Sequence, residues 1–163
     1  MKTVSDNQPV NFITHAPEQT EALGQALAQW IPLGTVLALK GDLATGKTCL
    51  VRGIARTLVP EANVNSPTFT LINEYGQNPR LYHLDLYRLN GPNELLHLGF
   101  EELVRPDSLC IIEWAERAEG ALPEPHIQID LHHVVSDTRK LTISPHGLLL
   151  PGWEQTLRKA ISS

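Results

Sequence analysis

Residues 41–48 carry the pattern that most constrains the fold of this chain. They read Gly-Asp-Leu-Ala-Thr-Gly-Lys-Thr, which matches the phosphate-loop spacing G-x-x-x-x-G-K-[ST]. A nearly continuous apolar run, residues 35–40, comes directly before them and predicts a strand that is buried on both faces. Apolar residues at helical spacing follow, up to Pro60. The sequence therefore predicts a turn between a buried strand and a helix, which is the setting that a phosphate-binding loop requires.

The residue types in this loop predict binding of ATP and Mg²⁺. Glycines at both ends let the backbone turn tightly, so that successive N–H groups point at phosphate oxygens, and the helix adds its positive end. Lys47 would supply a point charge to the β- and γ-phosphates, and the Thr48 hydroxyl is expected to ligate Mg²⁺. The predicted nucleotide-binding residues of the loop and the first helical turn are Gly41, Asp42, Leu43, Ala44, Thr45, Gly46, Lys47, Thr48 and Cys49.

A phosphate loop also needs an acidic group for Mg²⁺ at the end of a neighbouring strand. Glu113 directly follows four apolar residues, 109–112, and is our candidate for that group. Asp85 also lies on a predicted strand and competes with it, because the spacing does not tell which carboxylate touches the metal and which holds a water. Trp114, the next residue, is equally consistent with a place near the nucleotide, in the core or at an interface.

The remaining patterns predict an α/β fold of P-loop NTPase-like type. We expect a central mixed sheet with parallel core strands, flanked by helices and extended by antiparallel strands. The expected strands are 10–13, 35–40, 69–75, 81–87, 109–112, 127–131 and 140–144, with a hairpin over 69–87 and the last two strands antiparallel. The expected helices are 18–30, the one after the phosphate loop, one from Pro92 to near Gly99, and one after Pro151.

Thr14 and Pro17 supply the start signal of the first helix. The length of 163 residues predicts a single domain over residues 1–163.

Charge and composition limit the partners. The formal net charge is -5, and no run of Lys or Arg occurs, whereas proteins that hold nucleic acid by themselves usually present a basic face. If RNA enters the biology of this chain, another subunit would hold most of it. The start of the chain lacks the apolar stretch of a signal peptide, and the apolar runs are too short to span a membrane. We expect a cytoplasmic protein that does not contact a membrane.

Three motifs follow the phosphate loop along the chain. They are SPTFT at 66–70, HLDLYR at 83–88 and EW at 113–114. In this order they resemble the bacterial TsaE family (formerly YjeE), and the resemblance covers about residues 18–144. The phosphate loop alone is generic, whereas the other motifs are far more specific.

The resemblance implies a small α/β ATPase that works with TsaB and TsaD. Together these proteins place an N6-threonylcarbamoyl group on adenosine 37 of tRNA. A TsaE protein does not perform the transfer; it binds ATP at the TsaB–TsaD complex, and its hydrolysis is thought to reset that complex. It would meet tRNA indirectly, through these partners.

The resemblance also assigns roles to single residues. Glu113 matches the metal-site Glu of the family, and Trp114 matches the Trp beside the nucleotide. Thr68 lies in a segment like a switch loop near the γ-phosphate. Thr20 matches a Thr of the first helix near the nucleotide, and Arg139 a late Arg near the base. The predicted catalytic residues are Lys47, Thr68, Asp85 and Glu113; the predicted metal ligands are Thr48 and Glu113; Thr20, Trp114 and Arg139 join the nucleotide-binding set.

The chain departs from the family within the loop, where Ala44-Thr45 replaces the usual Gly-Ala. A β-carbon at position 44 is tolerable at negative φ and costly at positive φ, so the geometry of the loop is the property that this change affects.

Other features carry weaker hypotheses. His132 and His133 point to opposite faces of a strand and cannot ligate one ion. Arg88 fits a salt bridge better than an arginine finger, and the helix after Pro151 is expected to cover a sheet edge. A small-molecule kinase is one alternative function, although no Arg-rich lid is visible in the sequence. A binding switch with incidental hydrolysis is another, which the sequence does not separate from an ATPase.

Overall fold

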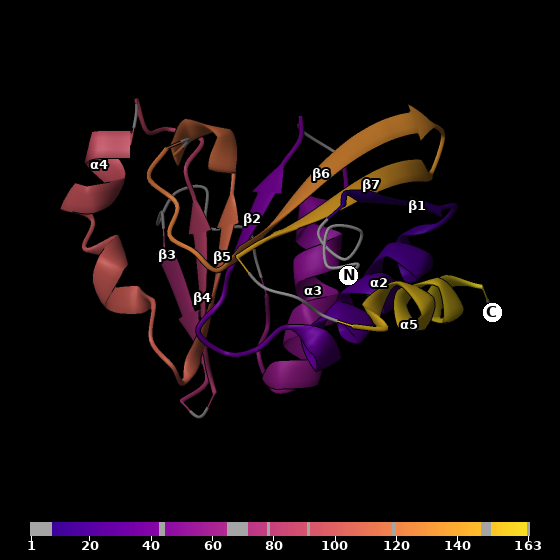
Figure 1. The fold of residues 1–163 in the computed structure, drawn as a ribbon, viewed down its shortest axis with the longest axis horizontal. Coiled ribbons are helices and arrows are strands. Elements are labelled where there is room, and N and C mark those ends of the chain that lie inside the picture. Colours follow the sequence, from indigo (N-terminus) through magenta and orange to yellow (C-terminus); the bar gives the residue numbers. More distant parts are fainter. Residues whose placement is uncertain are drawn as a thin grey trace.

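A mixed sheet runs through the whole molecule (Figure 1). The computed structural model describes residues 8–42, 45–64, 72–77, 79–90, 92–118, 120–147 and 151–162. Within these residues the seven strands are β1 (Val10–Thr14), β2 (Val36–Lys40), β3 (Ile72–Tyr75), β4 (Arg80–Asp85), β5 (Ser108–Glu113), β6 (His126–Val135) and β7 (Thr138–His146). The helices are α2 (Pro17–Trp30), α3 (Lys47–Leu58), α4 (Pro92–His97) and α5 (Trp153–Ile161), with 3₁₀ turns η1 (Phe100–Leu103) and η2 (Ala115–Ala118).

The strand order confirms the predicted fold class. It is β1-β7-β6-β2-β5-β4-β3, with parallel pairing from β6 through β2 and β5 to β4 and antiparallel pairing at both sides. The central strands β2 and β5 are buried almost throughout. Parallel strands covered on both faces need apolar side chains on both, which explains their unbroken apolar runs.

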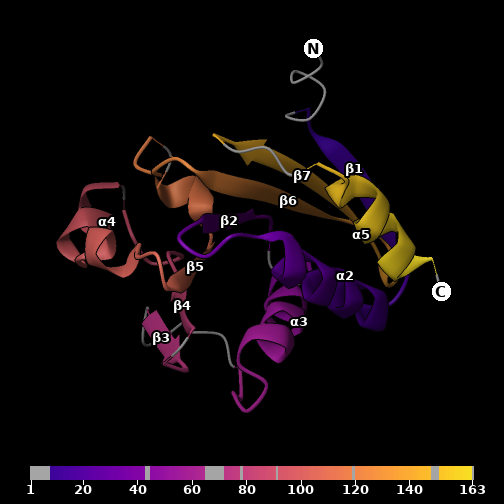
Figure 2. The ribbon, with the colours of Figure 1, turned by 60° about the horizontal axis from the view of Figure 1, so that its bottom comes forward.

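Helices cover the two faces of the sheet unequally. Figure 2 shows α2, α3 and α5 on one face and α4 on the other. Alternate residues of β2 therefore enter two separate cores. Leu37 and Leu39 pack with residues of α2 and α3, whereas Val36 and Ala38 pack with Leu95 of α4 and other residues of that side.

Helices α2 and α3 touch through two glycines. A β-carbon on Gly24 would lie 2.4 Å from the carbonyl oxygen of Leu50, and one on Gly53 would meet the carbonyl oxygen of Glu21. No larger side chain fits such backbone contact without moving a helix. The close packing brings the first turn of α2 beside the first turn of α3, where the phosphate loop ends.

Several boundaries differ from the expected ones. Pro17 is in the first turn of α2 as predicted, but Thr14 is not its cap. The hydroxyl of Thr14 instead hydrogen-bonds that of Thr20 at 2.7 Å, inside the protein. The Gln19 side chain reaches back and accepts from the His15 N–H at 2.6 Å, which satisfies a group before the helix.

Strand β4 ends at Asp85 rather than at residue 87, because the chain turns there. The Asp85 carboxylate accepts from the N–H of Tyr87 at 2.8 Å, which closes an Asx-type turn. Strand β3 confirms the hairpin with β4, and residues 69–71 of its expected range lie outside the described residues.

Two other elements differ in extent or place. The β6–β7 hairpin is longer than expected, since β6 continues to Val135 and β7 to His146. Helix α5 does not only cover an edge: Trp153 packs on Phe12 of β1 with ring centroids 6.1 Å apart, and the helix lies against α2. No helix within the described residues has the length and apolarity to cross a membrane.

Candidate functional site: a phosphate loop facing buried carboxylates

The loop leaves the carboxyl end of β2 and enters α3, as the sequence predicts. Gly41 has a φ of 146°, and a β-carbon there would lie 2.6 Å from the carbonyl oxygen of Leu131 on β6. Gly46 has a φ of 103° and forms the N-terminal cap of α3. These two positions need glycine because of backbone conformation and, at Gly41, because of space. Leu43 and Ala44 lie outside the described residues.

The loop holds its shape by internal hydrogen bonds. The buried hydroxyl of Thr45 donates to the carbonyl of Asp42 at 2.9 Å. No side chain caps the start of α3, so the N–H groups of its first turn can serve an external oxyanion. Thr48, in that same turn, is half-buried. The arrangement fits a bound phosphate chain, with Thr48 in the position of a metal ligand.

Lys47 is buried at the centre of the site. Its ammonium donates to the carbonyl of Gly41 and lies 3.8 Å from the ring centroid of Trp114. Burial lowers the pKa of Lys47, and negative charge nearby opposes that shift, first of all the charge of Glu113. The Lys47 ammonium is therefore placed so that phosphate oxygens could replace the Gly41 carbonyl and the Trp114 ring as its contacts.

Asp85 and Glu113 stand side by side at the carboxyl ends of two parallel strands. They are register partners, and each is only 3% exposed. Both face the α3 side of the sheet, because Leu81 and Ile111 at alternate positions of the same strands pack in the α2–α3 core. Oxygen ligands of this kind, together with substrate phosphates, suit Mg²⁺. Asp85 and Glu113 thus both remain candidates, together with Thr48, for holding Mg²⁺.

His83 contacts Glu113, which the sequence analysis did not predict. Its Nε2 lies 2.5 Å from Glu113 Oε2, and both side chains are buried. Alternation along a strand places His83 on the same face as Asp85, two residues on, and says nothing of Glu113. The parallel register of β4 and β5 brings it diagonally beside Glu113, and no pattern within one strand reports such a register.

Trp114 lies at the site, half-buried, in a left-handed conformation with a φ of 58°. Its ring packs against Tyr87, with centroids 4.8 Å apart, and against the Lys47 ammonium. Of the three places that the sequence left open, the structure shows two: Trp114 lies beside the phosphate loop, with one ring face on Lys47, and it also packs against the core on the α4 side of the sheet.

A small pocket opens on the other side of the α3 N-terminus. Its volume is about 80 Å³, and its lining residues come from α2, α3 and the β6–β7 hairpin. They are Pro17, Thr20, Gly46, Cys49, Asp137 and Arg139. Thr20, Cys49 and Arg139, far apart in the sequence, thus line one pocket, and their contact with a nucleotide stays a prediction. The Cys49 thiol is hydrogen-bonded to the carbonyl of Pro17 at 3.1 Å, and burial raises its pKa.

The predictions for Thr68 and Arg88, like those for Leu43 and Ala44, remain without a structural outcome. Thr68 lies outside the described residues. Arg88 is exposed after β4. His132 and His133 are exposed on β6, and among the described residues no group of three or more His, Cys, Asp or Glu is arranged to hold a metal ion.

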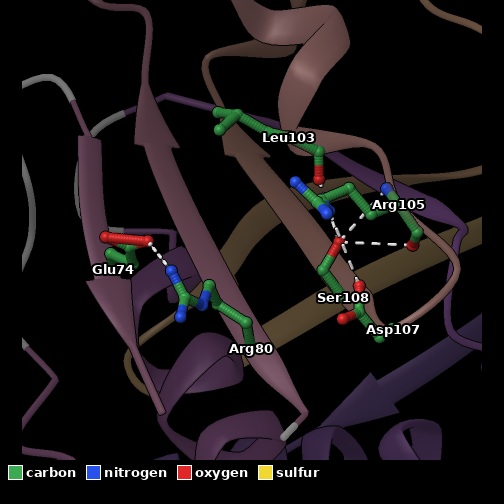
Figure 3. Close-up of polar contacts among 6 residues, drawn as sticks. All are labelled: Glu74, Arg80, Leu103, Arg105, Asp107 and Ser108. Atoms are coloured by element: carbon green, nitrogen blue, oxygen red, sulfur yellow. Dashed lines mark hydrogen bonds and ion pairs between the residues drawn. The ribbon is translucent and has the colours of Figure 1, made fainter. Parts of the chain in front are cut away.

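The opposite ends of the same strands carry a second polar region (Figure 3). Arg80 of β4 pairs with Glu74 of β3 at 2.6 Å, and Arg105 lies 3.8 Å from Asp107 just before β5. The hydroxyl of Ser108 donates to the carbonyl of Leu103 at 2.9 Å. A pocket of about 160 Å³ lies among these side chains, remote from the phosphate loop.

The path of the chain from β2 through this loop into α3, within a sheet of parallel core strands, defines a P-loop-type α/β protein. Within that class, the chain belongs to the TsaE family. The family model for threonylcarbamoyl adenosine biosynthesis protein TsaE matches residues 14–141. This confirms the resemblance that the sequence motifs indicated.

Individual relatives agree with this assignment. The chain is 35% identical over 132 residues to the tRNA threonylcarbamoyladenosine biosynthesis protein TsaE of Treponema pallidum, covering 81% of this chain and 98% of that one. It is 39% identical over 132 residues to the Bacillus subtilis protein of the same name, covering 80% and 82%. The crystal structure of Bacillus subtilis YdiB superposes with a TM-score of 0.68 at 30% identity, covering 94% of each chain.

Proposed function

We propose that this protein binds ATP with Mg²⁺ and hydrolyses it as part of tRNA threonylcarbamoyladenosine biosynthesis in the cytoplasm. Membership of the TsaE family supports the pathway. The observation that carries the proposed chemistry is the placement of Lys47, at the start of α3 and opposite the buried carboxylates of Asp85 and Glu113. Binding of a phosphate chain needs positively charged groups and N–H donors around it, and phosphoryl transfer to water needs acidic groups nearby that hold the metal ion.

The residues divide the work as follows. Loop N–H groups and Lys47 would bind the phosphates, after Lys47 leaves the carbonyl of Gly41 and the ring of Trp114. The Thr48 hydroxyl and Glu113 would hold Mg²⁺, with Asp85 in direct contact or through a water. The bound metal would neutralise charge that develops on the phosphates. Preorganised charges of this kind account for most of the catalysis expected in such a site.

The pocket beside α3 would receive the rest of the nucleotide. Thr20, Cys49 and Arg139 line it, and Gly46 joins it to the phosphate loop. Thr68 would respond to the γ-phosphate. The pocket is small, which suits contact with one edge of a nucleoside better than its full enclosure.

We further propose that hydrolysis depends on the TsaB–TsaD pair and resets that complex, so that tRNA is met through these partners. The net charge of -5 supports this division, because a chain with little positive charge gains little from phosphate contacts with RNA. An isolated small P-loop domain often lacks part of the charge arrangement that phosphoryl transfer needs, so the rate alone should be slow.

ATP hydrolysis by the purified chain, alone and with TsaB–TsaD from the same organism, tests the proposal. We expect a low rate that rises with the pair and vanishes in Lys47→Ala. A rate indifferent to the pair, with no complex in size-exclusion chromatography, would remove the partner-dependent function. Normal tRNA modification by a Glu113→Gln chain that binds ATP and hydrolyses it only at a small residual rate would instead identify a binding switch.

A further inference from the structure

We propose that His83 is a positioning residue for Glu113. It fixes the Glu113 carboxylate in one orientation by donating a hydrogen bond from Nε2 to Oε2, and thereby sets where the second carboxylate oxygen points. The inference rests on the proposed hydrolysis of ATP, in which Glu113 acts at the metal. Neither the motif spacing nor the comparisons with relatives assign this role to His83.

The contact is short and fully enclosed. Nε2 of His83 and Oε2 of Glu113 are 2.5 Å apart, and the side chains are 0% and 4% exposed. A hydrogen bond to an ionised carboxylate is stronger than one between neutral groups, and buried surroundings strengthen it further. Water does not reach this pair to compete for the carboxylate, so the bond can hold the side chain in one rotamer.

The backbone of Glu113 is already fixed, which leaves its side-chain torsions as the freedom to be restricted. In the sheet, Glu113 is the register partner of Leu39 in β2 and of Asp85 in β4. The backbone carbonyl of Glu113 accepts a hydrogen bond from the N–H of Leu86 at 3.1 Å. A Glu side chain has three torsions, and an unrestrained one would not keep its second oxygen in one place. His83 supplies the missing restraint.

The second ring nitrogen points to the same role. Among the buried side-chain nitrogens and oxygens of the described residues, Nδ1 of His83 is the one without a hydrogen-bond partner. An unpaired buried polar atom lowers stability, so a side chain needed only to fill this space would be apolar. Because a carboxylate oxygen accepts, Nε2 is the ring atom that carries the proton of this contact. The histidine is therefore explained by what Nε2 does.

Two single variants test the inference in the full chain with TsaB–TsaD present. His83→Leu removes the donor while filling the space. His83→Gln is the matched control, since its side-chain amide nitrogen can take the place of Nε2. We expect kcat for ATP hydrolysis to fall at least about tenfold in His83→Leu with little change in KM, the pattern of a lost transition-state interaction. His83→Gln should recover most of the rate.

A double variant separates positioning from general structural damage. If His83 acts through Glu113, then His83→Leu should lower kcat no further in a Glu113→Gln background. An equal further loss there would overturn the inference. Wild-type kcat in a folded His83→Leu chain would overturn it as well.

A readout without turnover completes the test. In the ¹⁵N-labelled full chain, the imidazole of His83 should show a slowly exchanging proton on Nε2, and its resonance should shift in Glu113→Gln. A ring protonated on Nδ1 alone, with no proton on Nε2, would contradict the assignment. A wild-type chain with no hydrolysis under any condition would reject the proposed function and this role with it, whereas a hydrolysing wild type with an unaffected His83→Leu chain rejects the positioning role alone.

Discussion

The two ends of strands β4 and β5 hold their charged side chains in opposite ways. At the carboxyl ends, His83, Asp85 and Glu113 are at most 3% exposed. At the amino end of β5, the side chains of Arg105 and Asp107 are 62% and 63% exposed, and their closest atoms are 3.8 Å apart. The same two strands thus carry a buried group of ionisable residues at one end and solvent-exposed ion pairs at the other, where the Arg80–Glu74 pair is close and the Arg105–Asp107 pair is loose.

The difference shows where the sheet is built for chemistry. Burying a charge is unfavourable unless hydrogen bonds or other charges compensate, so such groups persist where a function requires them. A surface pair is hydrated and contributes little to stability. Ligand sites of open α/β sheets lie beyond the carboxyl ends of the strands, which is the end that the loop after β2 reaches. The polar pocket at the amino ends is, by this comparison, an ordinary surface feature.

Among substitutions at the carboxyl ends of the parallel strands, Gly41→Ala should have the largest effect, a loss of ATP affinity. The new β-carbon would lie 2.6 Å from the carbonyl of Leu131, at a φ of 146° that disfavours alanine. Strain of this type amounts to about 1–3 kcal/mol. If it opposes the loop conformation that binds phosphate, ATP affinity should fall roughly 5- to 150-fold. Isothermal titration calorimetry would measure it.

Gly120→Ala is the matched control for Gly41→Ala. Gly120 also has a positive φ, 89°, but nothing lies within 4 Å of the added carbon. It should bind ATP as the wild type does. Equal loss of affinity in the two variants would show that global destabilisation, rather than the loop, limits binding.

A second prediction concerns stability at the carboxyl end. Glu113→Met leaves Nε2 of the buried His83 without its hydrogen bond, and His83→Leu does the same to the Glu113 carboxylate. Removing one member of a buried hydrogen-bonded pair costs about 1–3 kcal/mol, whereas replacing both by apolar groups is nearly neutral. The double variant should therefore unfold at higher urea concentration than either single one, while ATP hydrolysis is lost.

Urea denaturation of the four proteins measures this coupling. If the losses of unfolding free energy add, the double variant will be the least stable of the four proteins. The two side chains would then contribute independently, and the 2.5 Å contact between them would matter little to folding.

The sequence predicts the central part of the fold well because burial there is simple. Strands β2 and β5 lie under helices on both faces and read as continuous apolar runs, and the glycines mark the loop between β2 and α3. The hairpin was predicted too short because it becomes exposed: residues 132–135 of β6, His-His-Val-Val, all lie at the surface and do not alternate between apolar and polar side chains. Burial patterns predict a strand only as far as it is covered.

The sequence predicts individual residues of the site but not the contacts between them. Lys47, Thr48 and Gly46 follow from spacing along one segment, and so does an acid at the end of β5. The pairing of His83 with Glu113 depends on the register between two strands, and the meeting of Thr20 with Arg139 depends on how α2 packs beside the hairpin. Neither the register between two strands nor the packing of α2 against the hairpin can be read from the periodicity within one segment.

The smallest effect should come from Arg105→Ala at the amino end. The variant removes an exposed pair with Asp107, and such pairs contribute less than about 1 kcal/mol. The hydroxyl of Ser108 keeps its bond to the carbonyl of Leu103, because the substitution leaves the backbone in place. The melting temperature should change by less than roughly 2–4 °C, and ATP hydrolysis with the partners should match the wild type. Differential scanning calorimetry and the hydrolysis assay measure the two properties separately. Lost hydrolysis in a normally stable variant would place a functional contact at the amino end and end the contrast between the two ends of the sheet.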